Sequence, residues 1–236
     1  MLKVKNLHTS YGQLEVLHGV DIDVPEGNLA ILMGPNGHGK STLLKTICGL
    51  LRRTKGDITY KGNAIGKWRT EKIVGAGLVY IAEDRHLFSD MTVFENLEMG
   101  AYLENARKNE KDNLKLTYSL FPELEAKKNQ PASTLSGGQA RMLTIGRGIL
   151  SDAQFLCIDE PTIGLSPLLR QTVNSAICEI NQQGKTILLV EQNRSELFDM
   201  ASKIYFMEEG RIIFHGGKES ALDNDHLKEL FLGMRS

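Results

Sequence analysis

Short apolar runs and longer segments with helical spacing alternate along this chain. Four mainly apolar runs stop at turn residues or acids, at residues 29–33, 77–81, 154–159 and 185–190. Such runs are typical of strands buried in a helix-covered sheet. Apolar and polar positions also alternate within the segment from Leu2 to Val24, and short apolar runs flank residues 208–211, which predicts further strands, the last pair as a hairpin. The pattern predicts an α/β fold.

The segment from Met91 to Lys128 differs, because no strand pattern appears in it. Thr92 and Glu95 have the spacing of a helix capping box. Apolar residues then recur at helical intervals, at Leu97, Tyr102, Leu114, Tyr118 and Leu120. This spacing predicts a helical insertion. Other helices are predicted after Lys40, after Ser136, between Ser166 and Gly184, and from His226.

Composition limits the partners that the chain can bind directly. Of its 236 residues, 28 are Lys or Arg and 29 are Asp or Glu, so the net charge of −1 provides no general basic field for nucleic acid or an anionic membrane. No apolar run approaches the roughly 20 residues that cross a bilayer. The isolated histidines lack metal-ligand spacing. Three cysteines in apolar contexts are expected to be reduced core residues of a cytosolic protein: Cys48, Cys157 and Cys178.

One loop carries the strongest chemical signal. It lies between an apolar run and a helix and comprises Gly34, Pro35, Asn36, Gly37, His38, Gly39, Lys40, Ser41 and Thr42. Its pattern, G-x-x-x-x-G-K-S, lets backbone N–H groups and the helix dipole surround a polyphosphate. Lys40 adds a charge for the β- and γ-phosphates, and Ser41 adds a hydroxyl for Mg²⁺. The loop predicts a nucleoside triphosphate but not the reaction, because kinases, GTPases and motor ATPases share it.

Acidic residues follow two of the apolar runs. Asp159 and Glu160 are adjacent at the end of a buried strand, where they are costly unless a cation or a reaction uses them. We expect Asp159 to hold Mg²⁺ and Glu160 to polarise the attacking water. Glu83 follows the run at 77–81, and its position fits either a ligand contact or a solvated loop charge.

Two further segments leave alternatives open. The first comprises Ser136, Gly137, Gly138 and Gln139 at the start of a predicted helix. Open N–H groups there would bind a phosphate, or Ser136 is an ordinary N-cap. The second segment contains Tyr11, which would either stack on an adenine base, with Val16 beside it, or cover a sheet edge.

Together these segments resemble the ATP-binding-cassette (ABC) ATPases over essentially the whole chain. Residues 34–42 resemble the Walker A loop, and residues 155–160 resemble Walker B with its catalytic glutamate. Residues 135–139, Leu-Ser-Gly-Gly-Gln, match the family signature, and residues 161–166 resemble the loop that couples two cassettes. The ordered set is far more specific than the phosphate loop alone.

The resemblance implies one cassette domain over residues 1–236. It implies a P-loop, RecA-like core with an N-terminal antiparallel β subdomain, formed by residues 1–90 and 144–236. The inserted helical signature subdomain would comprise residues 91–143. Two positions depart from the general family pattern: Glu83 stands in place of a glutamine and Gln192 in place of a histidine. Both departures resemble the cassettes of branched-chain amino-acid importers.

The resemblance also implies ATP and Mg²⁺ as cofactors and assigns roles. Ser41, Glu83 and Asp159 would be metal ligands, and Glu160 and Gln192 would be catalytic. The other residues of the loop and signature, with Tyr11 and Val16, would contact the nucleotide.

The implied partners are a second cassette, identical or paralogous, and separate transmembrane permease subunits that dock near Glu83 and the helical insertion. A solute-binding protein would act only indirectly, and no nucleic acid is expected. The chain would be cytoplasmic and peripheral on the inner membrane face.

The alternatives are import of urea, amides or another solute, an ABC ATPase acting on DNA or ribosomes, a nucleotide sensor, and a P-loop kinase. The absence of basic extensions disfavours action on DNA or ribosomes. Glu160 disfavours a sensor, and the intact signature disfavours a kinase.

Overall fold

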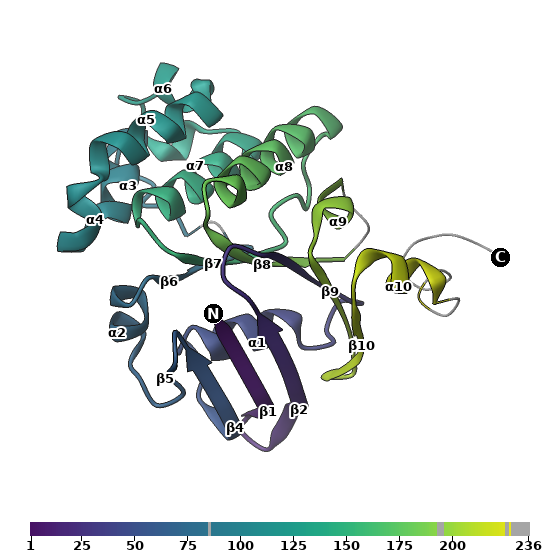
Figure 1. Ribbon diagram of the computed structural model, residues 1–236. Helices are drawn as coiled ribbons and strands as arrows, with labels where there is room; N and C mark the ends of the chain where they lie inside the picture. The colour runs from purple at the N-terminus through teal and green to yellow at the C-terminus, as the bar shows by residue number, and fades with distance from the viewer. Residues whose placement is uncertain (85, 193–195, 225–226, 228–236) are drawn as a thin grey trace.

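Two β-sheets organise the structure (Figure 1). The computed structural model describes the chain apart from residues 85, 193–195, 225–226 and 228–236. The antiparallel sheet has the order β2-β1-β4-β5 and contains β1 (Leu2–Tyr11), β2 (Leu14–Val24), β4 (Arg53–Tyr60) and β5 (Asn63–Ala64). The core sheet has the order β10-β9-β3-β8-β7-β6 and contains β3 (Leu29–Met33), β6 (Leu78–Ile81), β7 (Phe155–Asp159), β8 (Thr186–Glu191), β9 (Lys203–Glu208) and β10 (Arg211–Gly216).

The core sheet is parallel except for its edge strand β10, which pairs antiparallel with β9 as the predicted hairpin. Strands β3, β7 and β8 are buried at every position, which confirms three of the four predicted buried strands, whereas β6 is only partly buried at its two central residues. Side chains of β3 alternate between two cores: Leu29 and Ile31 pack on one face and Ala30 and Leu32 on the other. This alternation follows from the two-residue period of a strand.

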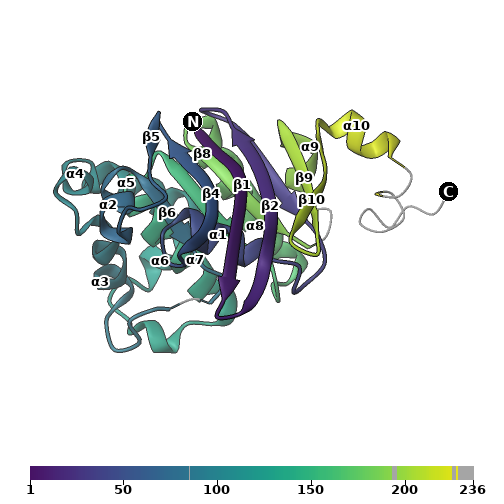
Figure 2. The same ribbon diagram turned by 90° about the horizontal axis from the view of Figure 1, so that it is seen from below.

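Each face of the core sheet has its own cover. Helices α7 (Gly137–Leu150) and α8 (Pro167–Gln182) lie over one face (Figure 1). Helix α1 (Lys40–Ile47) and the antiparallel sheet cover the other. Figure 2 shows the antiparallel sheet across α1, with the β9–β10 hairpin beside β2. The His18 N–H donates to the Gly210 carbonyl across that junction at 2.9 Å.

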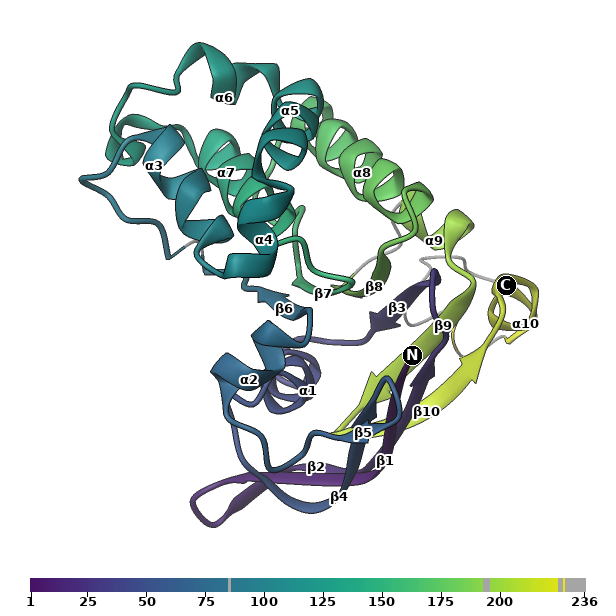
Figure 3. The same cartoon turned by 60° about the vertical axis from the view of Figure 1, so that its left-hand side comes forward.

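The segment between β6 and α7 is helical, as predicted. It contains α3 (Val93–Glu98), η1 (Met99–Ala101), α4 (Glu104–Lys108), α5 (Glu110–Leu120), α6 (Pro122–Ala126) and η2 (Ala132–Thr134). These helices gather at one end of the molecule, beside α7 (Figure 3). The capping box is confirmed, since the Thr92 hydroxyl accepts from the Glu95 N–H and the Glu95 carboxylate accepts from the Thr92 N–H.

Several features depart from the sequence expectations. A short helix, α2 (Thr70–Gly75), was not predicted, because only one of its residues, Ile73, is buried and the segment has little apolar periodicity. Cys48 and Cys157 are buried as expected, but Cys178 is partly exposed on α8, so its predicted core position is wrong.

Two more helices, α9 (Glu196–Met200) and α10 (Lys218–Asp223), lie near the C-terminus. The helix predicted from His226 begins outside the described residues. Among the residues that the structure describes, no helix is long and apolar enough to span a bilayer.

The entrance to the helical insertion is held by a buried amide. Asn96 on α3 is fully buried, and its Oδ1 accepts from the Phe88 N–H at 3.0 Å. Its Nδ2 donates to the carbonyls of Phe88 and Thr92 at 3.0 Å and of Met91 at 3.3 Å. One side chain therefore satisfies backbone groups that would otherwise be buried without partners.

Replacing this amide should destabilise the fold. We expect Asn96→Ala to lower the free energy of unfolding by about 2–3 kcal/mol, because it leaves buried backbone donors and acceptors without hydrogen-bond partners. The exposed Asn105 on α4 is a matched control, and Asn105→Ala should change stability by less than about 0.5 kcal/mol. Urea denaturation of both variants measures the difference, and equal effects would contradict the assigned role of Asn96.

Candidate functional site

The phosphate loop, residues 34–42, joins the end of β3 to the start of α1. Gly34 has φ 152°, and a Cβ there would lie 2.1 Å from the carbonyl oxygen of Met207 on β9. Gly39 has φ 100°, and a Cβ there would lie 3.0 Å from Leu17 of the antiparallel sheet. Glycine is required at both positions, because the backbone of the loop passes directly against both sheets.

Lys40 is buried at the centre of the loop. Its Nζ donates to the carbonyls of Gly34 at 2.8 Å and Pro35 at 3.0 Å and lies 3.6 Å from Glu160 Oε1. Burial lowers the pKa of Lys40, and the Glu160 carboxylate opposes that shift. The lysine is thus positioned by weak carbonyl acceptors that the oxygens of a phosphate could replace.

His38, in contrast, contacts the β9–β10 turn. Its Nδ1 accepts from the Glu209 N–H at 2.9 Å, and its carbonyl accepts from the Gly210 N–H at 3.0 Å. The side chain therefore anchors the loop to the core sheet.

Strand β7 ends at Asp159, which is 1% exposed. Tyr80 on the neighbouring strand β6 donates its hydroxyl to Asp159 Oδ2 at 2.7 Å. The other carboxylate oxygen, Oδ1, is buried and has no hydrogen-bond partner among the described residues. Such an atom is costly unless a cation or ordered water satisfies it. Burial, followed by the charge of Asp159, raises the pKa of Tyr80, which keeps it a neutral donor.

Glu160 follows directly, in a left-handed backbone conformation with φ 42°. Its Oε2 accepts from Gln192 Nε2 at 2.6 Å, and Lys40 lies near its other oxygen. Burial raises the pKa of Glu160, while Lys40 and Gln192 oppose the shift. The carboxylate is fixed in place but retains lone pairs that could orient a water molecule.

Lys40, Glu160 and Gln192 line one cavity of about 250 Å³, and Asp159 does not. Its predicted members are Asn36, Gly37, Gly39, Lys40, Ser41, Thr42, Glu83, Glu160 and Gln192, joined by Ile163. Ser41 and Glu83 also line a second cavity of about 450 Å³, and Asp159 lines only that second cavity. The three predicted metal ligands offer only oxygen donors, which Mg²⁺ prefers, and the unpartnered Asp159 Oδ1 fits such an ion.

Arg141 supports the loop that carries Glu83. This role was not predicted from the sequence. Arg141 is 2% exposed on α7, and its guanidinium donates to the carbonyls of Ala82 at 2.9 Å and Glu83 at 2.7 Å. An arginine at a core position of an apolar-periodic helix is a signal that could have identified it.

The signature residues are not part of either cavity. Ser136 caps α7, which was one of the two alternatives for this segment, and it forms a capping box with Gln139 that was not predicted, through bonds of 3.3 and 3.1 Å. None of Ser136, Gly137, Gly138 or Gln139 lines the site around Lys40. Within one chain the structure therefore does not bring the signature and the phosphate loop together.

The predicted base-contact residues lie on the β1–β2 hairpin. Val16 lies beside Gly39, with its Cγ1 3.5 Å from where a Cβ of Gly39 would stand. Tyr11 is 48% exposed and lies outside the cavity lining.

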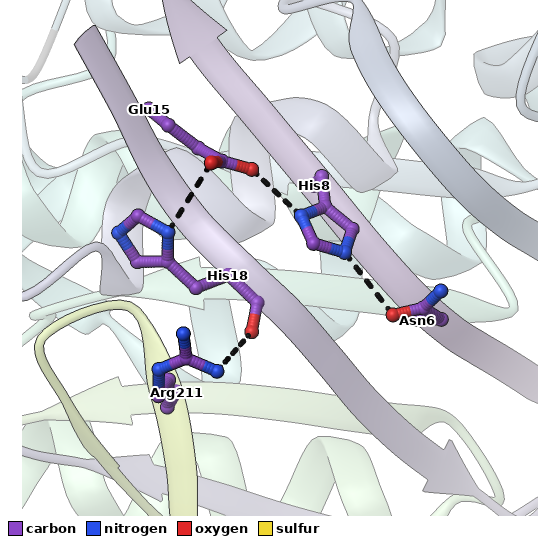
Figure 4. Close-up of polar contacts among 5 residues, drawn as sticks. All are labelled: Asn6, His8, Glu15, His18 and Arg211. Carbon is purple, nitrogen blue, oxygen red and sulfur yellow. Dashed lines mark hydrogen bonds and ion pairs between the residues drawn. The ribbon is translucent and has the colours of Figure 1, made fainter.

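A polar cluster braces this hairpin (Figure 4). The Glu15 carboxylate lies 2.6 Å from His8 Nδ1 and 3.5 Å from His18 Nδ1. Arg211 of β10 donates to the His18 carbonyl at 3.1 Å. The cluster ties the hairpin to the core sheet, and no metal-binding group of three or more His, Cys, Asp or Glu occurs in the described part of the chain.

Comparisons with known proteins agree with this geometry. Residues 17–163 match the family model of the ABC transporters. The chain is 35% identical to the high-affinity branched-chain amino acid transport ATP-binding protein BraG of Pseudomonas aeruginosa, over 99% of this chain and 100% of BraG. It is 33% identical to the probable branched-chain amino acid transport ATP-binding protein LivF of Archaeoglobus fulgidus, over 99% of both. A nucleotide-free ATP-binding cassette from an ABC transporter superposes with a TM-score of 0.85 at 25% identity, over 99% of both chains, which confirms the predicted fold class.

Glu191, at the end of β8, is a second buried acid beside the site. It is 7% exposed, and Thr162 donates to its Oε1 at 3.4 Å. Burial, followed by the charge of Glu160, raises the pKa of Glu191 to about 8. The neutral acid is therefore the main form of Glu191 at pH 7.

This raised pKa predicts a pH dependence of stability. Between the unfolded pKa near 4.5 and the folded value near 8, the folded chain binds an extra proton at Glu191, so stability falls as the pH rises. The fall is on the order of 1.4 kcal/mol per pH unit within that window. Glu191→Gln should remove this contribution, measured by urea denaturation at pH 5 and pH 8. Glu179→Gln, at an exposed position on α8, is the control. An unchanged slope in Glu191→Gln would refute the assignment.

Proposed function

Because this chain belongs to the ABC transporter family and is an ATP-binding cassette with ATPase activity, we propose that it powers the import of branched-chain amino acids through separate membrane subunits. The substrate class rests on the relatives BraG and LivF, whose names specify branched-chain amino acid transport. We also propose the division into a core of residues 1–90 and 144–236 and a helical signature subdomain of residues 91–143. The clustering of α3–α6 beside α7 supports that division.

The observation that carries the ATPase mechanism is the arrangement of three acids around Lys40. Glu83, Asp159 and Glu160 place an excess of negative charge at the loop that would receive phosphates, and Asp159 keeps one oxygen unpartnered. Ser41, Glu83 and Asp159 would hold Mg²⁺, which would neutralise phosphate charge when bound. Lys40 would bind the β- and γ-phosphates. Glu160 would accept a proton from the attacking water, and Gln192 would hold the Glu160 carboxylate in position.

The separation of the signature from the phosphate loop supports a shared site. In this proposal the open N–H groups at the start of α7 bind the phosphates held by a second cassette. Each site would then contain the phosphate loop of one cassette and the signature of the other. Closure would require nucleotide, and hydrolysis would reopen the pair.

The cavity of about 450 Å³ is the proposed docking groove for the permease. It lies between the core and the helical insertion and includes three exposed apolar side chains, Leu50, Met99 and Tyr102. Apolar side chains gathered at a concave surface are typical of protein contacts. Glu83 lines the same groove, so docking of the permease would change the surroundings of a residue of the ATP site. The chain would thereby be peripheral on the cytoplasmic face, with a solute-binding protein acting through the permease.

Glu160→Gln tests the mechanism. The amide cannot accept the proton from water, so turnover should fall by about 10²–10⁴-fold. With Mg²⁺-ATP, light scattering should detect a trapped dimer of the variant, while the wild type remains monomeric at steady state. The control Glu104→Gln, at an exposed position on α4, should behave as the wild type. Unchanged turnover in Glu160→Gln would overturn its role as the base. ATP binding without dimers in either protein would indicate a paralogous partner.

The docking groove makes a separate prediction. Tyr102→Glu places a charge on its exposed apolar surface and should reduce co-purification with the permease subunits by roughly tenfold. ATPase activity of the isolated cassette should stay within about twofold of wild type, since Tyr102 lies outside the ATP cavity. Ile213→Glu, at a similarly exposed apolar position on β10, should leave both unchanged. Full permease binding by Tyr102→Glu would place the contact elsewhere.

A further inference from the structure

A hollow lined by cationic side chains lies next to the docking groove. It has a volume of about 660 Å³ and lies among the end of α1, the start of β4 and the segment that enters α2. Figure 3 shows α2 beside α1 in this region, and the Thr70 hydroxyl joins them by donating to the Gly49 carbonyl at 3.0 Å. The basic pocket is defined here by Arg52, Arg53, Lys67 and Arg69.

The charge of this pocket is not balanced locally. Glu71 is the only acid in its lining, so four cationic side chains and one carboxylate leave a local charge of +3. None of the four cations forms an ion pair within the described part of the chain. Like charges gathered in a concave site repel one another, and an anion bound there would remove that cost. The net charge of the whole chain is −1, so the cluster does not reflect a generally basic surface.

Arg53 is half-buried in the pocket rather than extended into solvent. Its guanidinium donates to the Gly56 carbonyl, while its Nε is buried and has no hydrogen-bond partner among the described residues. A Cβ at Gly66 would lie 2.3 Å from that Nε, so a larger residue there would displace the arginine side chain. A buried guanidinium N–H without an acceptor is costly, and an oxyanion would satisfy it.

A tryptophan completes the lining. Trp68 is the single tryptophan of the chain, and the Nζ of Lys72 lies 4.0 Å from its ring centroid. The hydroxyl of Thr54 is a further possible donor in the lining. The guanidinium, ammonium and hydroxyl groups that line the basic pocket are the donors that bind phosphate oxygens in proteins.

We propose that the basic pocket binds a phosphate group, either of a small soluble phosphate compound or of an anionic phospholipid headgroup. A phosphate monoester carries more charge than a single carboxylate and so matches the local charge of +3 more closely. Three arginines can present paired N–H donors to its oxygens. The site is separate from the ATP cavity, because no residue of the loop 34–42 lines it. The proposal therefore does not depend on the proposed transport function.

The test compares three full-length proteins: the wild type, Arg52→Gln with Lys67→Gln, and Lys111→Gln with Lys115→Gln. All four positions are exposed, so both double variants should fold, and each removes two positive charges. Arg53 is not substituted, because its guanidinium donates a hydrogen bond to the Gly56 carbonyl. Isothermal titration calorimetry with inorganic pyrophosphate measures soluble binding. The phosphate loop is present in all three proteins, so only a difference between the double variants reports the basic pocket. A change in Trp68 fluorescence would show that pyrophosphate binds at the basic pocket.

Co-sedimentation with phosphatidylglycerol vesicles, compared with phosphatidylcholine vesicles, forms the second arm. Loss of two charged donors should weaken binding by about tenfold or more in the pocket variant, while the α5 variant stays within about twofold of wild type. A response to pyrophosphate alone identifies a soluble phosphate compound, and a response to phosphatidylglycerol alone identifies a lipid headgroup. Failure of the wild type in both arms, or equal binding by both double variants, would overturn the proposal.

Discussion

The site depends on keeping acidic groups buried at the end of strand β7. Asp159 and Glu160 are 1% and 6% exposed, and Lys40 opposite them is 4% exposed. Charges so far from water are tolerated only when neighbours satisfy them. Tyr80, Gln192 and Lys40 do so in part, and one oxygen of Asp159 remains without a partner among the described residues. The surrounding fold therefore maintains a costly arrangement that a bound metal nucleotide would relieve.

The parallel sheet explains how residues distant in sequence reach this point. Strands β3, β7 and β8 lie side by side, so the phosphate loop, the acids at 159–160 and Gln192 all follow strand ends at one edge of the sheet. Helix α7 begins with the signature and contributes Arg141 to the support of Glu83. In the proposed mechanism the same helix would bind a second cassette at its start, while its Arg141 supports the loop of Glu83 in its own chain.

Helix α2 separates two surfaces of different chemistry. Val74 lines the proposed docking groove, which combines apolar and charged side chains, whereas Thr70 and Glu71 line the basic pocket. The groove reaches Glu83 and Asp159, so a partner bound there would adjoin the proposed metal ligands. The basic pocket instead adjoins the C-terminal end of α1, whose N-terminal end is the phosphate loop. The basic pocket thus borders the ATP site without sharing its phosphate loop, whereas the groove shares Ser41 with that loop.

The sequence by itself determined the features that depend on neighbours along the chain. The phosphate loop, the buried strands and the caps at Thr92 and Ser136 follow from local spacing, because glycine conformations, strand periodicity and capping bonds span only a few residues. Tertiary structure alone decided that Tyr80 binds Asp159, 79 positions away, and that Arg141 braces Glu83. It also made Glu191 a buried acid and gathered the basic pocket. These contacts depend on strand order and helix packing, which bring together side chains that no spacing along the sequence relates.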